Sequence, residues 1–223
     1  MNTERLGAEI PQDAESVEQT QKPLRLPMPL AKDLVTRSDL IDYAAQNVTL
    51  EGLWLEFGVY KGKSIRKIAG HTRADIYGFD SFEGLPEDWV LSYCRGDFSL
   101  QGRMPADLPA NVKLLKGRFC ETLPAFLEIH AQPVAFLHVD CDLYSSTKTV
   151  LTCLRNRLTA GSIILFDEFH NFPGWRQHEY RAFMEFIADT RYAFEYIGWA
   201  SGYNSVAARI TGGPNASEHQ GST

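Results

Sequence analysis

The residues of this chain that could do chemistry fall into two groups, and the first is an acid followed by widely spaced glycines. Glu56 lies near the end of an apolar run, and Gly58 and Gly62 follow it before an amphipathic segment. Glycine lets a backbone pass close to a ligand, and the free N–H groups at a helix start point toward the same place. The spacing differs from the G-x-G-x-x-G pattern that holds a pyrophosphate. We therefore expect a nucleoside with a cationic or zwitterionic tail.

A second acid repeats this arrangement further along the chain. Asp80 follows the short run Asp75–Phe79, and Ser81 begins a loop that could fold over an adenine. In a doubly wound sheet, a carboxylate at the end of the second strand is where a ribose diol is held. Acids are also common as caps at helix starts. Because two such acids follow consecutive predicted strands, a nucleoside site is favoured over separate caps.

The second group consists of acids after two later apolar runs. Asp140 follows one run, and Asp167 and Glu168 follow the next. Adjacent parallel strands end at the same edge of a sheet, so the three carboxylates are expected to converge. Such a cluster needs protonation, cationic partners or a metal, and an all-oxygen set suits Mg²⁺. Separate capping and salt-bridge roles are the alternative, and capping of the following helix is the role favoured for Asp142.

Alternating apolar and amphipathic segments must position these residues. The predicted strands are Leu53–Phe57, Asp75–Phe79, Val112–Leu115, Val134–Val139 and Ser162–Phe166, with a closing hairpin of Phe194–Trp199 and Asn204–Ile210. The predicted helices are Lys32–Asn47, which Ser38 and Asp39 could divide in two, Lys63–Ala69, Thr122–His130, Ser145–Leu158 and Trp175–Thr190. This alternation predicts an α/β fold with a doubly wound, mostly parallel, seven-stranded sheet that ends in an antiparallel hairpin, with helices on both faces.

Aromatic residues lie close to the acids in the sequence. The segment Glu87–Ala110 has no clear periodicity and contains Trp89, Tyr93 and Phe98. We interpret it as a long active-site loop or lid. A second aromatic set could wall an acceptor pocket, although helix-to-sheet packing is the commoner role for such residues. It comprises Phe169, Phe172, Trp175 and Tyr180.

Composition is ordinary for one globular domain of 223 residues. The net charge is −6 and no basic cluster occurs, which argues against a nucleic-acid partner. Four scattered cysteines and the lack of a signal peptide or membrane-spanning run predict a cytoplasmic protein with no membrane partner. We divide the chain into a polar, proline-rich arm at 1–31, one domain at 32–210 and a disordered tail at 211–223.

Several motifs occur in an order that resembles one family. They are Glu56-Phe-Gly-Val-Tyr-Lys-Gly62, Tyr77-Gly-Phe-Asp-Ser-Phe-Glu-Gly-Leu-Pro86, Leu115-Lys-Gly-Arg-Phe119 with Thr122-Leu-Pro124, and Leu137-His-Val-Asp-Cys-Asp-Leu-Tyr-Ser-Ser-Thr147. From about residue 34 to 210 the chain resembles the macrocin O-methyltransferase family of class I S-adenosylmethionine-dependent methyltransferases. The resemblance implies a Rossmann-like enzyme of natural product biosynthesis, usually magnesium-dependent, that methylates hydroxyls of sugars.

The residues and the resemblance together give a predicted site. The expected cofactor contacts are Glu56, Gly58, Tyr60, Gly62, Ser64, Asp80, Ser81, Gly117 and Asp140. The expected Mg²⁺ ligands are Asp140, Asp167 and Glu168, with Asp140 also acting as the catalytic base that accepts the hydroxyl proton. Many relatives carry two aspartates where this chain has Asp167 and Glu168, which leaves the oxygen donors unchanged but lengthens one of them.

Two other functions compete with this prediction. Asp140-Cys-Asp142 after an apolar strand is also typical of metal-dependent glycosyltransferases, but that interpretation leaves Asp80 and the glycine loop without a role. A non-catalytic nucleoside-binding module would need no acid cluster. We expect a small-molecule hydroxyl acceptor as the partner. The segment Pro23–Leu30 could serve a homodimer contact or could pack on its own subunit.

Overall fold

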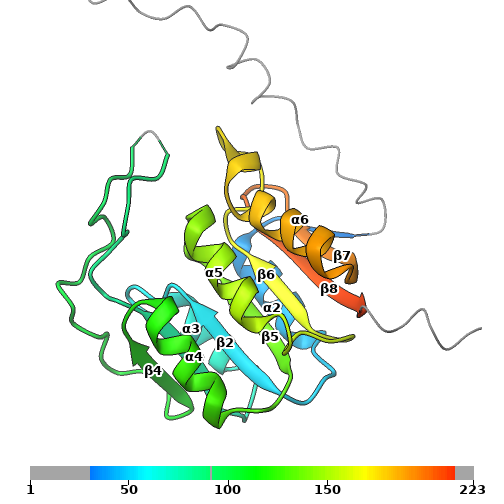
Figure 1. Cartoon of the computed structure of the whole chain (residues 1–223), viewed down its shortest axis with the longest axis horizontal. Helices are drawn as coiled ribbons and strands as arrows, with labels where there is room; N and C mark the ends of the chain where they lie inside the picture. Colours follow the sequence, from blue (N-terminus) through cyan, green and yellow to red (C-terminus); the bar gives the residue numbers. More distant parts are fainter. Residues whose placement is uncertain (1–30, 91, 214–223) are drawn as a thin grey trace, which may run out of the picture.

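The computed structural model describes residues 31–90 and 92–213, and these fold around one eight-stranded sheet (Figure 1). The strands are β1 (Lys32–Leu34), β2 (Leu53–Phe57), β3 (Ile76–Asp80), β4 (Val112–Lys116), β5 (Val134–Val139), β6 (Ile163–Phe166), β7 (Ala193–Ala200) and β8 (Val206–Gly212). Their order is β1-β7-β8-β6-β5-β2-β3-β4. Only β8 runs antiparallel to its neighbours among the described strands.

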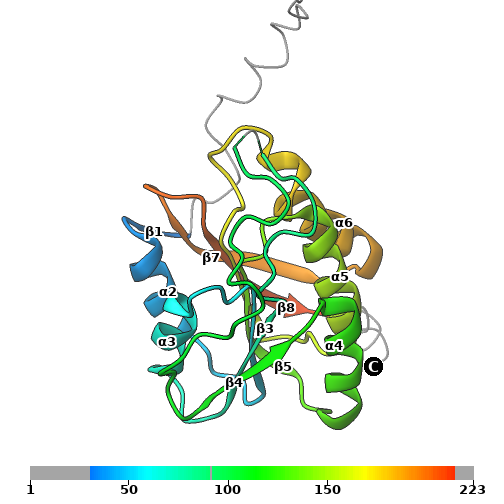
Figure 2. The ribbon, with the colours of Figure 1, turned by 90° about the vertical axis from the view of Figure 1, so that its left-hand side faces the viewer.

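Helices cover both faces of the sheet, as Figure 2 shows. They are α2 (Arg37–Gln46), α3 (Lys63–Ala69), α4 (Phe119–Ile129), α5 (Tyr144–Leu154), the short 3₁₀ helix η1 (Trp175–Gln177) and α6 (Glu179–Thr190). In that view α2 and α3 lie on one face, and α4, α5 and α6 lie on the other. Every residue of the central strands β2 and β5 is buried, because helices pack on both sides of a mostly parallel sheet. The doubly wound fold predicted from the sequence is confirmed.

The N-terminal part of the domain differs from the prediction. A helix was predicted over Lys32–Asn47, and the sheet was predicted to have seven strands. Instead, Lys32–Leu34 forms an eighth strand, which pairs in parallel with β7. The Thr36 hydroxyl then accepts a hydrogen bond from the backbone N–H of Asp39 at 3.1 Å. This N-cap begins the helix at Arg37, so an edge strand and a helix replace one longer helix.

A long loop joins β3 to β4 and lies above the carboxyl ends of the strands. Its described residues contain neither helix nor strand, which agrees with the predicted long loop, whereas its role as a lid stays a prediction. The loop is fastened at its base, because the N–H groups of Leu100 and Gly102 both donate to the Phe82 carbonyl at 3.0 and 2.8 Å. The backbones of Leu85 and Gly96 also pair at 2.9 Å. Backbone hydrogen bonds therefore hold the base of this loop in place.

Some of the predictions fall on residues outside the described ranges. Residues 1–30 and 214–223, which make up most of the predicted arm and tail, belong to this part of the chain. The domain boundaries and the homodimer therefore stay predictions. Within residues 31–90 and 92–213, no helix has the length and apolar character needed to cross a membrane.

Candidate active site

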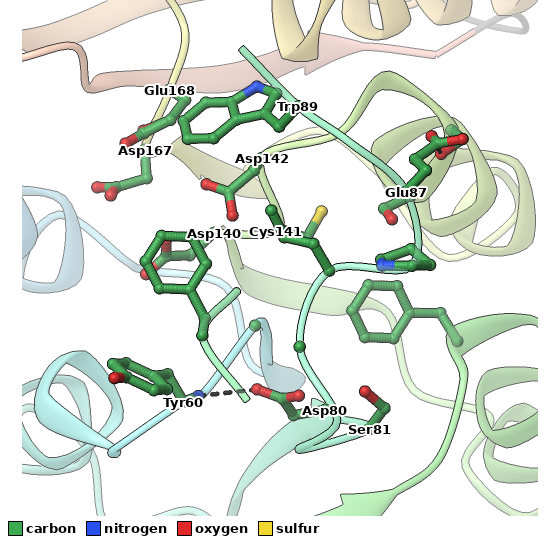
Figure 3. Close-up of a pocket in the computed structure, with 18 of the residues that line it drawn as sticks. Tyr60, Asp80, Ser81, Glu87, Trp89, Asp140, Cys141, Asp142, Asp167 and Glu168 are labelled. Carbon is green, nitrogen blue, oxygen red and sulfur yellow. Dashed lines mark hydrogen bonds between the residues drawn. The ribbon is translucent and has the colours of Figure 1, made fainter. Parts of the chain in front are cut away.

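A cavity of about 690 Å³ opens at the carboxyl ends of β2, β3, β5 and β6. Its volume is in the range of small-molecule sites, and its position is where ligands bind in open α/β sheets. Figure 3 shows two groups of side chains along its wall. Tyr60, Asp80 and Ser81 lie at one end, whereas the acids that follow β5 and β6 lie at the other, near Trp89. The two groups of residues identified in the sequence thus share one cavity.

The first end of the cavity is shaped by a close approach of two loops. Gly58 has a φ of +91°, and its N–H donates to the Phe79 carbonyl at 3.0 Å. A Cβ at this position would lie 1.7 Å from the backbone oxygen of Asp140. The Asp140 N–H in turn donates to the Phe57 carbonyl at 2.9 Å. Only glycine leaves room for this crossing, which brings the loop after β2 against the loop after β5.

Asp80 holds the loop after β2 from the neighbouring strand. Its Oδ2 accepts the N–H groups of Val59 and Tyr60, each at 2.8 Å, and its Oδ1 accepts the Phe82 N–H at 2.7 Å (Figure 3). A carboxylate has about four lone-pair sites, so acceptor capacity remains for a ribose hydroxyl. Asp80 therefore fixes the shape of the loop and still presents oxygen to the cavity.

Glu56 lies behind this loop and has no exposed surface. The Ser64 hydroxyl donates to its Oε1 at 2.9 Å, and the His138 Nδ1 is 3.2 Å from its Oε2. Burial, followed by the charge of Asp140, raises the pKa of Glu56 well above its usual value. Burial lowers the pKa of His138 to about 4, so the imidazole is neutral at pH 7.

The predicted cofactor contacts therefore separate into two sets. Those that line the cavity are Gly58, Tyr60, Asp80, Ser81, Gly117 and Asp140. Glu56, Gly62 and Ser64 lie outside its wall, and they build the strand-to-helix turn from behind. Gly62 is the left-handed residue, with a φ of +75°, that precedes the first turn of α3. Whether each of the nine touches a cofactor stays a prediction.

The predicted acids do converge at the second end of the cavity. Asp140, Asp142, Asp167 and Glu168 all line it. Burial and the neighbouring charge of Asp167 raise the pKa of Glu168 to about 11, so this side chain is protonated at neutral pH. Burial and the charge of Asp140 raise the pKa of Asp142 to about 7. The Ser205 hydroxyl donates to Asp167 Oδ1 at 3.0 Å.

Arg37 supplies the positive charge of this cluster, and the sequence analysis did not identify it. Its Nη2 lies 2.5 Å from Asp140 Oδ2, and its Nε forms a second ion pair with Asp167 Oδ1. Burial opposes the charge, yet the carboxylates of Asp140 and Asp167 raise the pKa of Arg37 above its usual value. Arg37 is the first residue of α2, far from the motifs that carry the acids, and no local pattern in the sequence connects them.

Two further acids differ from the sequence interpretation. Asp142 was expected to cap the following helix, but the N-cap of α5 is Leu143 and no side chain caps that end, so the expectation is wrong. Asp142 instead has a φ of +63° and faces the cavity. Glu179 was not identified from the sequence, although it is fully buried and accepts the Glu168 N–H at 3.0 Å. Its position in an amphipathic helix gave no signal.

The aromatic residues divide between the cavity and the core. Trp89 stacks on Tyr93 with ring centroids 5.2 Å apart, and Phe172 meets the Trp89 ring edge-on at 5.8 Å. These three rings line the cavity. Phe169 and Trp175 are buried in helix-to-sheet packing instead, as the commoner role predicted. Only Phe172 of the second aromatic set therefore faces the site.

A model of the family described as a methyltransferase domain matches residues 55–169, slightly more than half of the chain. Two curated relatives come from Streptomyces. The 8-demethyl-8-(2,3-dimethoxy-alpha-L-rhamnosyl)-tetracenomycin-C 4'-O-methyltransferase of Streptomyces olivaceus is 26% identical, and the demethyldecarbamoylnovobiocin O-methyltransferase of Streptomyces niveus is 28% identical. Each alignment covers 60% of this chain and 60% of the relative, so the chain spans less than two thirds of the length of either relative.

Among solved structures, the chain is similar to CalS11, a calicheamicin methyltransferase. The TM-score is 0.62 at 23% sequence identity, and the alignment covers 94% of this chain and 98% of that one. At this identity the likeness is one of fold. It supports the doubly wound α/β fold described above.

Proposed function

The chain belongs to the methyltransferase-domain family, and from this premise we propose that it is an S-adenosylmethionine-dependent O-methyltransferase that acts on a sugar hydroxyl of a secondary metabolite. Membership supports the methyltransferase activity predicted from the sequence and argues against the glycosyltransferase alternative. The narrower assignment to the macrocin O-methyltransferase family stays a prediction.

The observation that carries the proposal is that two chemically different ends belong to one cavity. Asp80 and the loop at Gly58 form one end, and an acid cluster forms the other. The first end has the features expected for an adenosyl group, namely a close backbone and a carboxylate for the ribose. The second end has oxygen groups that can receive a proton. A methyl donor and a hydroxyl acceptor would meet between them.

The proposed chemistry is an in-line substitution at the methyl carbon. The acceptor oxygen forms a bond to this carbon while the bond from carbon to sulfur breaks, which gives S-adenosylhomocysteine and a methyl ether. The hydroxyl proton passes to the carboxylate of Asp140, the proposed general base. Alignment of the two substrates within near-attack distance supplies much of the rate. Arg37 Nη2 lies 2.5 Å from Asp140 Oδ2 and holds the base in position.

The proposed acceptor class rests on the relatives and on the aromatic wall. Both curated relatives are O-methyltransferases by name, and one acts on a rhamnosyl group. Trp89 and Phe172 offer apolar ring faces next to the acids. Such faces suit the C–H surface of a deoxysugar, while hydroxyls reach the polar groups. The aglycone to which the sugar is attached would then lie under the lid.

Magnesium assistance is the part of the prediction that the described residues do not fit. Among residues 31–90 and 92–213, no group of three or more His, Cys, Asp or Glu side chains is arranged to hold a metal ion. Two of the three expected ligands, Asp140 and Asp167, are paired with Arg37 instead. Burial raises the pKa of the third, Glu168, to about 11, so this side chain would have to lose its proton before it could bind an ion. We therefore assign no step to Mg²⁺.

Calorimetric titration tests the proposal first. S-adenosylmethionine and S-adenosylhomocysteine should bind with micromolar affinity, and UDP-glucose should not bind. Incubation with deuterated-methyl S-adenosylmethionine and a panel of rhamnosylated metabolites should then give a labelled product by mass spectrometry. Binding of UDP-glucose alone would return the chain to the glycosyltransferase alternative. Binding of the cofactor without transfer to any hydroxyl would favour the non-catalytic module.

A further inference from the structure

We propose that the guanidinium of Arg37 takes the place of a divalent metal ion in the acid cluster. The site would then work without a metal ion and would exclude one. The metal-binding part of this inference does not depend on the proposed methyl transfer. The part that concerns turnover rests on the proposed function.

The first step of the argument is geometric. The guanidinium of Arg37 bridges two carboxylates that belong to neighbouring strands, with Nη2 on Asp140 Oδ2 at 2.5 Å and Nε on Asp167 Oδ1. Figure 3 shows the carboxylates of Asp140 and Asp167 turned to the same side of the cavity. A metal ion held by both side chains would lie between the same two carboxylates, where its charge would meet the charge of the guanidinium. The guanidinium and the ion therefore compete for one position.

The second step concerns burial and charge. The side chain of Asp167 is 8% exposed and that of Asp140 is 23% exposed, so water screens their mutual repulsion poorly. A planar guanidinium carries a permanent charge and several N–H donors, and it suits a bridge between two carboxylates. Removal of one member of such a buried group leaves charge without compensation. Without Arg37, Asp140 and Asp167 would lack a positive partner, and these are the carboxylates that a metal ion would use.

The third step is that the fold delivers Arg37 to this place. The edge strand β1 pairs with β7, and Thr36 then caps α2 so that Arg37 becomes its first residue. Arg37 lines the cavity beside the acids, although it lies outside the part of the chain that matches the family model. The segment from β1 to the start of α2 therefore contributes a charged side chain to the site, in addition to packing on the sheet.

Direct measurement of metal binding tests this inference without any acceptor. Mn²⁺ serves as the probe, because the electron paramagnetic resonance signal of the free ion falls when it binds oxygen ligands. The wild-type chain should leave the signal unchanged at millimolar Mn²⁺. Arg37→Gln frees both carboxylates and should bind Mn²⁺ at least about ten-fold more tightly than the wild type. The double variant R37Q/D167N should lose that gain. A damaged structure alone would not create a new metal site.

Turnover and two further variants complete the test. Wild-type activity should persist in excess EDTA, whereas the residual activity of R37Q should rise on addition of Mg²⁺. Arg37→Lys keeps the charge and should still exclude Mn²⁺, which gives a second measurement if R37Q does not fold. Arg73→Gln is the matched control, because it removes an exposed arginine before β3, at the end of the strand away from the cavity. It should change neither Mn²⁺ binding nor activity.

Two results would overturn the inference. One is wild-type binding of Mn²⁺ that disappears in Asp167→Asn, because the ion would then displace Arg37. The other is loss of wild-type activity in EDTA that Mg²⁺ restores. Failure to bind S-adenosylmethionine would instead contradict the proposed function and leave the Mn²⁺ result standing.

Discussion

Glu56 and His138 are partners across the central strands β2 and β5, and their side chains meet in a space closed to water. The register pairs the two residues directly, the Oε2 to Nδ1 distance is 3.2 Å, and neither side chain is exposed. Burial disfavours the charged form of both groups, so it raises the pKa of Glu56 and lowers that of His138. Burial therefore favours the uncharged form of both side chains. It links the glycine loop to the strand that carries Asp140.

This relationship predicts how Glu56→Gln changes stability with pH. The pKa of Glu56 is higher in the folded chain than its unfolded value of 4.5, so its stabilisation is complete below pH 4.5 and is lost as the pH rises through the folded pKa. Glutamine keeps the shape and does not titrate. We expect the variant to lie within about 1 kcal/mol of the wild type at pH 5 and to gain relative stability toward pH 9.

Urea unfolding at pH 5, 7 and 9 measures this difference in the free energy of unfolding. Glu51→Gln, at an exposed position just before β2, is the control and should show the same pH dependence as the wild type. A wild type that becomes more stable than E56Q as the pH rises would contradict the sign of the prediction.

The close approach of two loops at Gly58 predicts that Gly58→Ala is far more destabilising than the same substitution at Gly96. Gly58 and Gly96 have nearly the same φ, +91° and +92°, so alanine strains the backbone similarly at both. A Cβ at Gly58 would meet the Asp140 oxygen at 1.7 Å, whereas a Cβ at Gly96 meets nothing within 4 Å. We expect Gly96→Ala to cost about 1–2 kcal/mol and Gly58→Ala about 2–3 kcal/mol more. Denaturant unfolding of the two variants checks this, and equal costs would refute it.

The three backbone hydrogen bonds to Asp80 predict a role in both stability and cofactor binding. Asp80→Asn replaces a charged acceptor by an amide with one acceptor oxygen, so the loop at Tyr60 should lose part of its support. We expect a cost of about 1–3 kcal/mol and at least about ten-fold weaker binding of S-adenosylmethionine by calorimetry.

Asp75→Asn is the matched control for this variant. Asp75 lies just before the opposite end of the same strand, and its contact with Lys113 is an exposed pair at 3.8 Å. It should change the free energy of unfolding by less than about 0.5 kcal/mol and leave cofactor affinity unchanged. Equal affinity losses in the two variants would mean that Asp80 has no special part in the site.

The sequence predicted the central elements well because their signals are local. Leu53–Phe57, Lys63–Ala69 and Val134–Val139 have the predicted bounds, since continuous apolar runs and helical spacing define them. The strand Lys32–Leu34 was missed because three residues carry no periodicity of their own. Its pairing with β7 depends on a partner at the other end of the chain.

The candidate site shows the same division between local and distant information. The acids were identified because each follows an apolar strand, and topology brings such strand ends together. Such an acid cluster needs protonation, cationic partners or a metal; burial favours the protonated form of Glu168, and Arg37 is the cation. Arg37 was missed because 103 residues separate it from Asp140 and only the fold makes them neighbours.

The role of Asp140 as base predicts a separation of turnover from binding. Asp140→Asn keeps the shape and cannot accept the proton, so kcat should fall by about 10²–10⁴ while the Kd of S-adenosylmethionine stays within about three-fold. Asp142→Asn, in the same cavity wall, should lower kcat less than ten-fold. Steady-state turnover assays give kcat, and calorimetry on the same samples gives the Kd of S-adenosylmethionine. Equal losses of binding and turnover in D140N would remove Asp140 from the role of base.

Trp89 predicts a second separation, between acceptor and cofactor. Its indole N–H is buried and has no hydrogen-bond partner among the described residues, although it belongs to the cavity wall beside the acids (Figure 3). The ring itself lines the cavity and offers an apolar surface to an acceptor. Trp89→Phe keeps most of the aromatic surface and should raise the KM for the acceptor about three- to ten-fold, whereas Trp89→Ala also removes the contacts with Tyr93 and Phe172 and should raise it further. The Kd of S-adenosylmethionine should stay constant in both variants. Unchanged KM values would show that the lid covers the cavity without touching the acceptor.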